Sequence, residues 1–363
     1  MTEPGDLTVT TVSASLYNED CFDAFARIKD ASVDAVITDP PYFLDKLGDT
    51  WKTEEMKHAT KSSAVTSLPV GMKFDAQQGR MFQEFMERVA VEALRVLKPG
   101  GFFLSFSAPR LYHRLGVAVE DAGFEVRDLW AWIYTQNQVK AMSVERFVDS
   151  SKLTKKQREK LLRELLVWKT PQVKSCIEPI VFAQKPKVNE SGKSVTFLEN
   201  WMAHHVGLVN INSGVGAGGD MVTANLLTTG PINDALDKAF LVPKPTKAEK
   251  GTTTHVSVKP LVLMDQLIRA TVIEGGLVLD PFSGSGSTGI SALRLGRSYI
   301  GFELAGEYFK QSRKRFEEAF KEEGLTWKTA TKTSITTEIK TTALSYQSYA
   351  LAQSNDGDGD KVE

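Results

Sequence analysis

The stretch "LVLDPFSGSGSTG", residues 277–289, decides the fold class of this chain of 363 residues. Its first four residues have the pattern of an apolar strand, a turn with two glycines follows, and a helix pattern starts near Thr288. Gly284 and Gly286 permit backbone conformations that other residues avoid, so a ligand can lie against the main chain. The helix N-terminus beyond them offers unpaired N–H groups to a negatively charged group. The stretch therefore predicts a nucleoside cofactor on an α/β sheet.

An acidic residue follows this turn at the end of the next strand pattern, 298–304. The carboxylate of Glu303 at that position can accept hydrogen bonds from both ribose hydroxyls of a nucleoside. The letters "GSGSTG" (284–289) also fit the G-x-G-x-x-G pattern of dinucleotide sites. The glycine turn alone thus leaves both NAD and S-adenosylmethionine open as cofactors.

Strand and helix patterns alternate in two blocks of the chain. Before the glycine turn we expect strands at 14–20, 33–39, 102–107 and 124–134, and helices at 21–30, 81–97 and 110–121. The second block begins at Lys259-Pro260 with a helix that ends before Gly275, and it closes with a helix over 307–320. Strands that alternate with helices imply a parallel sheet covered on both faces.

Residues 136–250 lose this rhythm and are interpreted as an inserted region. Over 140–187 there are 12 Lys or Arg residues against five Asp or Glu residues, a difference of +7, in a chain whose formal net charge is −1. A solvated charged helix and a surface that contacts phosphates both fit this composition. The Thr- and Ser-rich residues 326–363 predict a disordered tail.

The composition is that of an ordinary soluble protein, with 42% hydrophobic and 25% charged residues. The two cysteines, Cys21 and Cys176, give no disulfide framework, and the N-terminus has no signal-peptide pattern, so we expect a cytoplasmic protein without membrane contact. The histidines at 204, 205 and 255 lack acidic or cysteine partners at ligand spacing, and no metal site is expected.

A second strand pattern, 33–38, ends in "DPPY" at 39–42, which a surface turn does not need. Pro40 disfavours a helical conformation at Asp39, and the two prolines stiffen the turn. The Asp39 carboxylate and the Pro40 carbonyl are then two fixed acceptors, which suit the two N–H groups of an exocyclic amine. Tyr42 offers a flat face for a heterocycle. This arrangement predicts methylation of an aromatic amine on a base flipped out of a duplex. The polar residues from 43 to about 75 predict a mobile loop that closes on the base or on DNA.

At these residues the sequence resembles the amino-methyltransferases of DNA, the N6-adenine and N4-cytosine family. "DPPY" and "DPFSGSGST" (280–288) match two family motifs, and their order is that of the beta class. "THVSVKP" (254–260) is similar to the family's H-P-x-x-K-P stretch, with Val256 in place of the first proline. Further similar segments, best matched in phage and prophage members, are "EALRVLKPGGFFLSFSAPRLYHRL" and "IEPIVFAQKP". Together these segments lie within roughly 15–187 and 252–320.

The resemblance implies a three-layer α/β fold, the Rossmann-like sheet of S-adenosylmethionine-dependent methyltransferases with an inserted target-recognition region. It divides the chain into an N-terminal extension (1–14), a catalytic half (15–135), a DNA target-recognition region (136–250), a cofactor-binding half (251–325) and the tail (326–363). The catalytic residues would be Asp39, Pro40, Pro41 and Tyr42. The cofactor-binding residues would be Asp20, Ser257, Lys259, Asp280, Phe282, Ser283, Gly284, Ser285, Gly286 and Glu303.

The function expected from the resemblance is site-specific transfer of a methyl group from S-adenosylmethionine to N6 of adenine in double-stranded DNA. Asp39 favours adenine because family members that act on N4 of cytosine usually have Ser there. N4-cytosine methylation, a nicotinamide oxidoreductase and a non-catalytic DNA-binding module remain alternatives. A homodimer and a cognate restriction endonuclease are possible partners. Trp132, Tyr134 and Trp168 are candidates for a second aromatic residue against the base.

Overall fold

The computed structural model describes residues 9–42, 76–133, 145–149, 153–170, 175, 177–210, 226–227, 244–251, 253–255, 257–321, 324–330 and 333–342. The described strands form one sheet in the order β6-β4-β5-β3-β2-β7-β8-β1-β10-β9. Their bounds are β1 Val9–Tyr17, β2 Val33–Thr38, β3 Leu97–Phe106, β4 Glu125–Ile133, β5 Ile177–Gln184, β6 Leu226–Leu227, β7 Leu277–Asp280, β8 Ser298–Phe302, β9 Lys328–Thr329 and β10 Ser334–Thr342.

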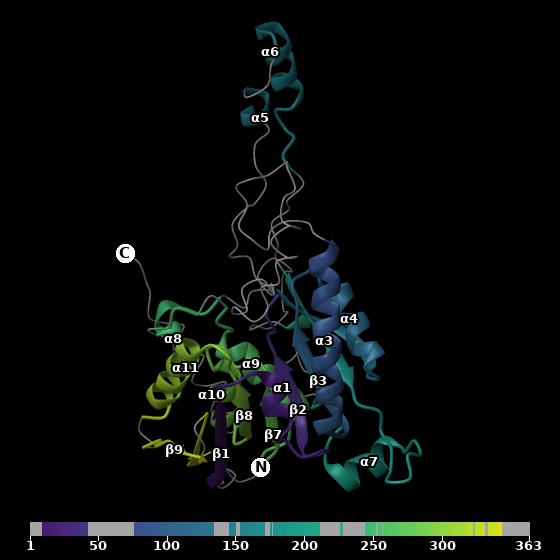
Figure 1. Ribbon diagram of the computed structural model, residues 1–363, viewed down its shortest axis with the longest axis vertical. Helices are drawn as coiled ribbons and strands as arrows, with labels where there is room; N and C mark the ends of the chain where they lie inside the picture. The colour runs from purple at the N-terminus through teal and green to yellow at the C-terminus, as the bar shows by residue number, and fades with distance from the viewer. Residues whose placement is uncertain are drawn as a thin grey trace, which may run out of the picture.

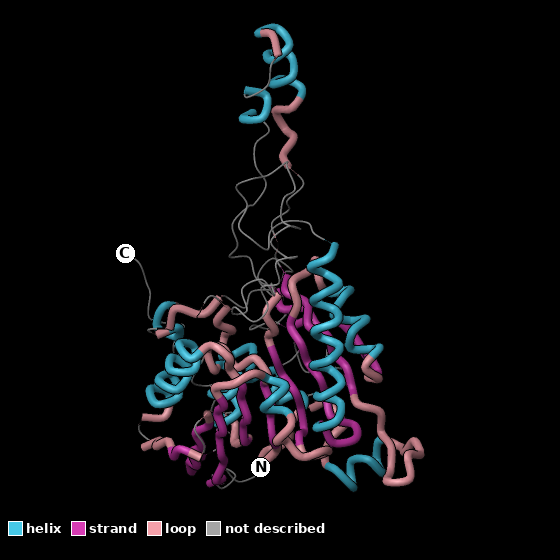
Figure 2. The backbone as a smooth tube through the Cα atoms, viewed as in Figure 1, coloured by secondary structure: helices cyan, strands magenta, loops and turns pink. Residues whose placement is uncertain are grey.

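Helices cover both faces of this sheet, which gives three layers (Figures 1 and 2). The layered helices are α1 (Cys21–Phe25), α3 (Ala76–Val96), α4 (Tyr112–Asp121), α9 (Leu261–Thr271), α10 (Ser287–Arg294) and α11 (Gly306–Ala319). The other described helices lie outside the layers or at their margins: α5 (Glu145–Asp149), α6 (Lys155–Glu164), α7 (Phe197–His204) and α8 (Lys247–Lys250). The three-layer α/β fold expected from the sequence is confirmed.

Alternation along the central strands distributes the core to the two faces. In β2, Val36 packs with α1, α3 and α4, whereas its neighbour Ile37 packs with α9, α10 and α11. Phe103 and Leu104 of β3 divide in the same way. Because successive side chains of a strand point to opposite faces, a run of six buried residues in β2 requires a helix layer on each side.

The sheet is mixed, so the expectation of a parallel sheet holds for its central strands and is wrong for β5. The strands β2, β3, β7 and β8 and the adjacent β1 run parallel, but β5 is antiparallel to both of its neighbours, β3 and β4. The boundaries drawn around the insertion also change, because β5 lies within 136–250 and is a fully integrated strand between β3 and β4. Its last six residues, 179–184, are buried, so this part of the region belongs to the core.

Both ends of the described chain extend the sheet, contrary to the expected N-terminal extension and disordered tail. β1 begins at Val9, inside the expected extension 1–14, and β10 lies inside the expected tail 326–363. In β10, Ile335, Thr337 and Ile339 are buried at alternate positions. This period of two marks a strand with one buried face, and the Thr-rich composition concealed it. The helix expected at 21–30 is also shorter, since α1 ends at Phe25.

Helices α5 and α6 lie apart from the sheet, at the end of the view that carries no other described element (Figure 1). Thr154 and Gln157 form a capping box at the start of α6, which has no buried residue. The loop expected from residue 43 to about 75 lies outside the described residues. Within the described ranges, no helix is both long and apolar enough to cross a bilayer.

Candidate active site

The two sequence motifs meet at one edge of the sheet because β2 and β7 are parallel neighbours. Thr38, the last residue of β2, donates a hydrogen bond from Oγ1 to Oδ1 of Asp280, the last residue of β7, at 2.7 Å. The "DPPY" segment follows the first strand and the glycine turn follows the second. The carboxyl ends of parallel strands are where open α/β sheets bind their ligands, so the motifs share one site.

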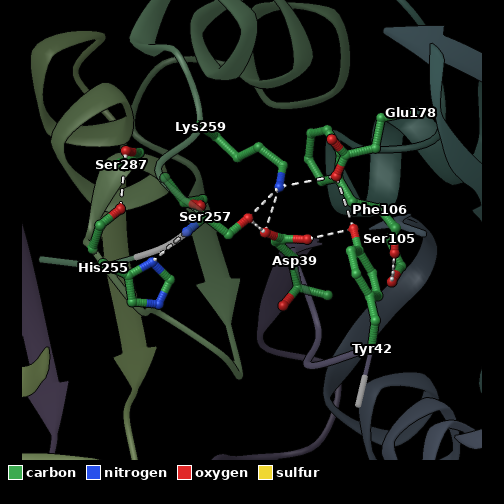
Figure 3. Close-up of polar contacts among 12 residues, drawn as sticks. Asp39, Tyr42, Ser105, Phe106, Glu178, His255, Ser257, Lys259 and Ser287 are labelled. Atoms are coloured by element: carbon green, nitrogen blue, oxygen red, sulfur yellow. Dashed lines mark hydrogen bonds and ion pairs between the residues drawn. The ribbon is translucent and has the colours of Figure 1, made fainter. Parts of the chain in front are cut away.

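The Asp39 carboxylate is the centre of a polar network (Figure 3). Its Oδ1 accepts a hydrogen bond from the Tyr42 hydroxyl at 2.6 Å, and its Oδ2 accepts one from the Ser257 hydroxyl at 2.6 Å. The Lys259 ammonium also donates to Oδ2. Asp39 is thus held from both sides, by its own motif and by the segment before α9. The network brings together residues that lie more than 200 positions apart in the sequence.

Glu178 of β5 is a member of this network that sequence reasoning missed. Its Oε1 lies 2.8 Å from the Tyr42 hydroxyl and 3.0 Å from Lys259 Nζ. The signal was present in "IEPIVFAQ", where a single carboxylate stands at the start of an otherwise apolar strand. Because the strand was not expected to enter the sheet, the position of Glu178 at the catalytic edge could not be inferred.

Burial and charge set the protonation of these groups. Burial by itself would lower the pKa of Lys259, but the carboxylates of Asp39 and Glu178 outweigh it and raise that pKa. Burial raises the pKa of the Tyr42 hydroxyl well above its usual value, and the two carboxylates add to the shift. Burial also raises the pKa of Glu178, although the Lys259 ammonium opposes this. At neutral pH the site therefore contains an ammonium, a neutral phenol and two interacting carboxyl groups.

The segment 254–260 was expected to face a cofactor through Ser257 and Lys259. Both side chains instead donate to Asp39, and Lys259 Nζ also lies 2.9 Å from Ser257 Oγ. The ammonium is 4.8 Å from the centroid of the Phe106 ring at the end of β3, within range of a cation–π contact. In this structure the two residues belong to the part of the site around Asp39, and their contact with a cofactor stays a prediction.

The glycine turn is shaped by the residues around it. Gly284 and Gly286 have φ values of +51° and +79°, which favour glycine, and Gly286 is the N-cap of α10. Asp280 accepts hydrogen bonds from the Phe282 N–H at 3.0 Å and from the Thr288 hydroxyl at 2.7 Å. Burial raises the pKa of Asp280 to about 6. The Thr38 hydroxyl donates to the same carboxylate. Asp280 therefore holds the turn in place, and its oxygens are already engaged by groups of the protein.

The serines of the turn are buried and tied to the protein. The Ser283 hydroxyl accepts a hydrogen bond from Tyr299 at 3.0 Å, and the Ser285 carbonyl accepts one from Arg315 at 2.5 Å. The Phe282 ring packs near that of Phe85, with centroids 5.7 Å apart. These contacts fix the course of the backbone, so the surface that the turn offers to a ligand is mainly its main chain.

Glu303 and Asp20 lie at adjacent strand ends. The Glu303 N–H donates to the Tyr17 carbonyl at 2.9 Å, which joins the end of β8 to the end of β1. The Glu303 carboxylate accepts the N–H groups of Gly284 at 2.9 Å and of Ala305 at 2.8 Å. Burial raises its pKa to about 7. Asp20 accepts the Phe22 N–H at 2.9 Å as the N-cap of α1.

This geometry fits a nucleoside cofactor. Glu303 is a poorly solvated carboxylate that still has lone pairs for ribose hydroxyls. The positive φ values of Gly284 and Gly286 give the turn its course beside this carboxylate, with His255 close to Gly284 and Phe316 close to Gly286. A three-layer sheet with such a turn beside fixed strand-end acceptors defines a class of protein, the nucleoside-binding proteins of Rossmann-like fold, to which S-adenosylmethionine-dependent methyltransferases belong.

Comparison with known proteins specifies the family. The model of the DNA methylase family matches residues 33–314, so the chain belongs to the N6/N4 amino DNA methyltransferases. The cofactor of the family is S-adenosylmethionine. The chain is 29% identical to the type II methyltransferase M.HindIII of Haemophilus influenzae, over 79% of this chain and 90% of that protein. It is 27% identical to the type II methyltransferase M2.DpnII of Streptococcus pneumoniae, over 83% and 89%.

Among solved structures, the PvuII DNA methyltransferase, described as cytosine-N4-specific, is similar in fold. Its TM-score is 0.51 at 18% sequence identity, over 86% of this chain and 92% of that chain. The crystal structure of the M1.HpyAVI complex with S-adenosylmethionine has a TM-score of 0.45 at 21% identity, over 83% and 98%. The likeness to the PvuII enzyme concerns the fold.

The remaining candidate residues separate into different environments. Trp132 is buried in the core, Trp168 is 64% exposed beyond the end of α6, and Tyr134 lies outside the described residues. In the β4–β5 ladder Trp132 stands opposite Glu178, and the role of a second aromatic residue against the base stays a prediction. Within the described part of the chain, no group of three or more His, Cys, Asp or Glu side chains is placed to hold a metal ion.

Proposed function

We propose that this chain transfers a methyl group from S-adenosylmethionine to the N6 amino group of adenine in double-stranded DNA. The observation that carries the proposal is the juxtaposition of Asp39 with the glycine turn through the Thr38–Asp280 hydrogen bond. A base at Asp39 and a cofactor at the turn would then be neighbours. The bound cofactor supplies an electrophilic sulfonium methyl group.

The residues of the chain act on the amino group of the base. Its lone pair is delocalised into the ring, so the nitrogen is a poor nucleophile. The Asp39 carboxylate and the Pro40 carbonyl accept its two N–H groups and stabilise the positive charge that develops on nitrogen during transfer. Holding the nitrogen in line with the methyl group lowers the activation barrier by roughly several kcal/mol, the order of magnitude known for positioned reactants. The base must leave the duplex to reach these acceptors.

Adenine is the proposed base because Asp, not Ser, occupies the first position of the motif. A direct test incubates the purified chain with methyl-labelled S-adenosylmethionine and unmethylated bacterial genomic DNA, then separates the hydrolysed nucleosides. We expect the label in N6-methyldeoxyadenosine. Label in N4-methyldeoxycytidine would overturn the choice of base, and unlabelled DNA would overturn the enzymatic function. Sequencing that detects modified bases on the same DNA gives the recognition sequence.

Helix α6 supports DNA as the partner. Lys155, Lys156 and Lys160 are exposed on a helix without buried residues, which is the composition of a phosphate-contacting element. We assign the target-recognition role to the region 136–250, apart from β5. A cognate restriction endonuclease is proposed because the two relatives named above are type II methyltransferases. We also propose that the chain forms a homodimer, which sedimentation can check. Its proposed location is the cytoplasm.

A further inference from the structure

Lys259 occupies the acceptor that the target amino group needs. Its side chain is only 6% exposed, and its ammonium is surrounded by Asp39, Glu178 and Ser257, all within hydrogen-bond distance. An ammonium and an exocyclic amino group are both N–H donors, and both are attracted to Oδ2 of Asp39. The amino group of a base that enters the site must therefore replace the Lys259 ammonium at Asp39, or bind to Asp39 beside it.

Tyr42 is shared between the same two acids. Its hydroxyl lies 2.6 Å from Asp39 and 2.8 Å from Glu178, but it has only one proton to donate. Glu178 thus competes with Asp39 for both neighbouring donors, the ammonium and the phenol. Both donors already bond to Asp39, and without the Glu178 carboxylate they would no longer be shared with a second acid. The acceptor for the base would then be more fully occupied.

The charges of the network lead to the same role. With both acids ionised, two carboxylates face one ammonium, which leaves a net charge of −1 beside the amino nitrogen. Loss of the Glu178 charge would reduce this to a neutral Lys259–Asp39 pair. A neutral pair in a buried site stabilises a developing positive charge less than a site with excess negative charge does.

We propose that Glu178 is a positioning residue for methyl transfer, which holds Lys259 and Tyr42 so that the Asp39 carboxylate is available to the target amino group. This role rests on the proposed function and extends it. It concerns a residue of β5, a strand separated from both family motifs in the sequence. Glu178 acts through Lys259 and Asp39, without contact with the reacting atoms.

A double-mutant cycle tests this role. The variants are Glu178→Gln, Lys259→Gln and the pair together, with kcat and KM for DNA measured by transfer of label to genomic DNA. We expect Glu178→Gln to lower kcat/KM about 100-fold, a loss typical of removed electrostatic stabilisation. In the Lys259→Gln background the same change should cost clearly less, about tenfold, since the ammonium that Glu178 holds is gone while its contact with Tyr42 and its charge remain. If the loss of kcat/KM in the double variant equals the product of the losses in the two single variants, the proposal is overturned. A fully active Glu178→Gln would overturn it as well.

Two further variants guard against trivial explanations. Asp34→Asn breaks an ion pair of another buried carboxylate, in which the partly exposed Lys98 has its Nζ 2.8 Å from Asp34, away from the site. It should lower the melting temperature and leave kcat/KM unchanged. Glu178→Asp keeps the charge and should be at least about tenfold more active than Glu178→Gln, even if the latter folds poorly; equal activities would overturn the proposal. Cofactor affinity by calorimetry reports folding of each variant.

Failure of this role can be distinguished from failure of the proposed function. If the wild-type chain leaves DNA unlabelled or labels cytosine, the proposed function is wrong. If the wild-type chain labels adenine but the costs of the two substitutions multiply, only the role of Glu178 is wrong. If the wild-type chain labels adenine and the two losses of kcat/KM do not multiply, the proposed function and the role of Glu178 are both supported.

Discussion

The hydroxyl of Thr38 and the carboxylate of Asp280 join two strand ends that are 242 positions apart in the sequence. Asp280 also accepts the Phe282 N–H and the Thr288 hydroxyl, so one buried carboxylate connects β2, β7 and the start of α10. The acceptors for the base and the turn for the cofactor are therefore fixed relative to each other by a single side chain.

Thr38→Val removes one of the three donors from Asp280 without changing the shape of the side chain. We expect the free energy of unfolding to fall by about 1–3 kcal/mol, because a buried carboxylate loses a hydrogen bond. Urea titration measures this change. Thr271→Val is the matched control, since the buried Thr271 hydroxyl donates to the Leu267 carbonyl of its own helix. Equal losses in the two variants would contradict the role given to Asp280.

Gly286→Ala and Gly275→Ala separate strain from overlap. Both glycines have φ of +79°, but a Cβ at Gly275 would meet no atom within 4 Å, whereas at Gly286 it would approach Ser312 Oγ to 2.5 Å and Phe316 to 2.7 Å. Gly275→Ala should cost about 1 kcal/mol from strain alone. Gly286→Ala should cost roughly 1–3 kcal/mol more, from overpacking, and weaken cofactor binding. Thermal unfolding measures the loss of stability in each variant, and calorimetry measures cofactor binding. Equal losses of stability in the two variants would count against a tightly packed turn.

Asp39→Ala removes the acceptor for the amino group. Methyl transfer should fall by at least about 10³-fold, because the fixed carboxylate beside the Pro40 carbonyl is gone. Binding of S-adenosylmethionine, measured by calorimetry, should survive, since the glycine turn and Glu303 are unchanged. Retained methyl transfer in this variant would overturn the catalytic role of Asp39.

Glu303 makes cofactor affinity depend on pH. Its pKa of about 7 means that the carboxyl is largely protonated at pH 6 and ionised at pH 8. The ionised form accepts hydrogen bonds from ribose hydroxyls, so the dissociation constant for S-adenosylmethionine should fall about tenfold from pH 6 to pH 8. Calorimetry at both pH values tests this, and Glu303→Gln should abolish the difference. A pH-dependent difference that persists in the variant would assign it to another group.

Helix α6 can be tested through the salt dependence of DNA binding. Replacement of Lys155, Lys156 and Lys160 by Gln should reduce the slope of log affinity against log salt by about 0.9 for each phosphate that these lysines neutralise. The control replaces three basic residues of α11, namely Lys310, Arg313 and Lys314. Fluorescence anisotropy with a duplex at several salt concentrations gives both slopes. If the two triple variants behave alike, α6 is simply a solvated helix.

Much of the fold could be predicted because its signals are local. The apolar period of α3, the turn at Gly284 and Gly286, and the proline-fixed segment after β2 each depend on neighbouring residues. The positions of β5 and β10 could not be predicted in this way, since antiparallel pairing joins residues distant in the sequence. Composition then dominated the interpretation of these strands, and it pointed to an insertion and a tail.

The same distinction holds for the candidate site. Asp39 and Glu303 follow recognisable strand patterns, so their place at the sheet edge could be expected. Glu178 enters the site only because β5 inserts between β3 and β4. The bonds from Ser257 and Lys259 to Asp39 depend on how the segment before α9 crosses that edge, which no local pattern encodes.

The pairing of β10 with β1 has a practical consequence for any shortened form of this protein. β10 covers β1 along all nine residues, from Val9 with Thr342 to Tyr17 with Ser334. A chain cut at residue 325, where the tail was expected to begin, would leave the backbone N–H and C=O groups along this side of β1 unpaired. Such an exposed edge is a template for aggregation between molecules. Truncation for crystallisation, or fusion to another protein, should therefore begin after Thr342.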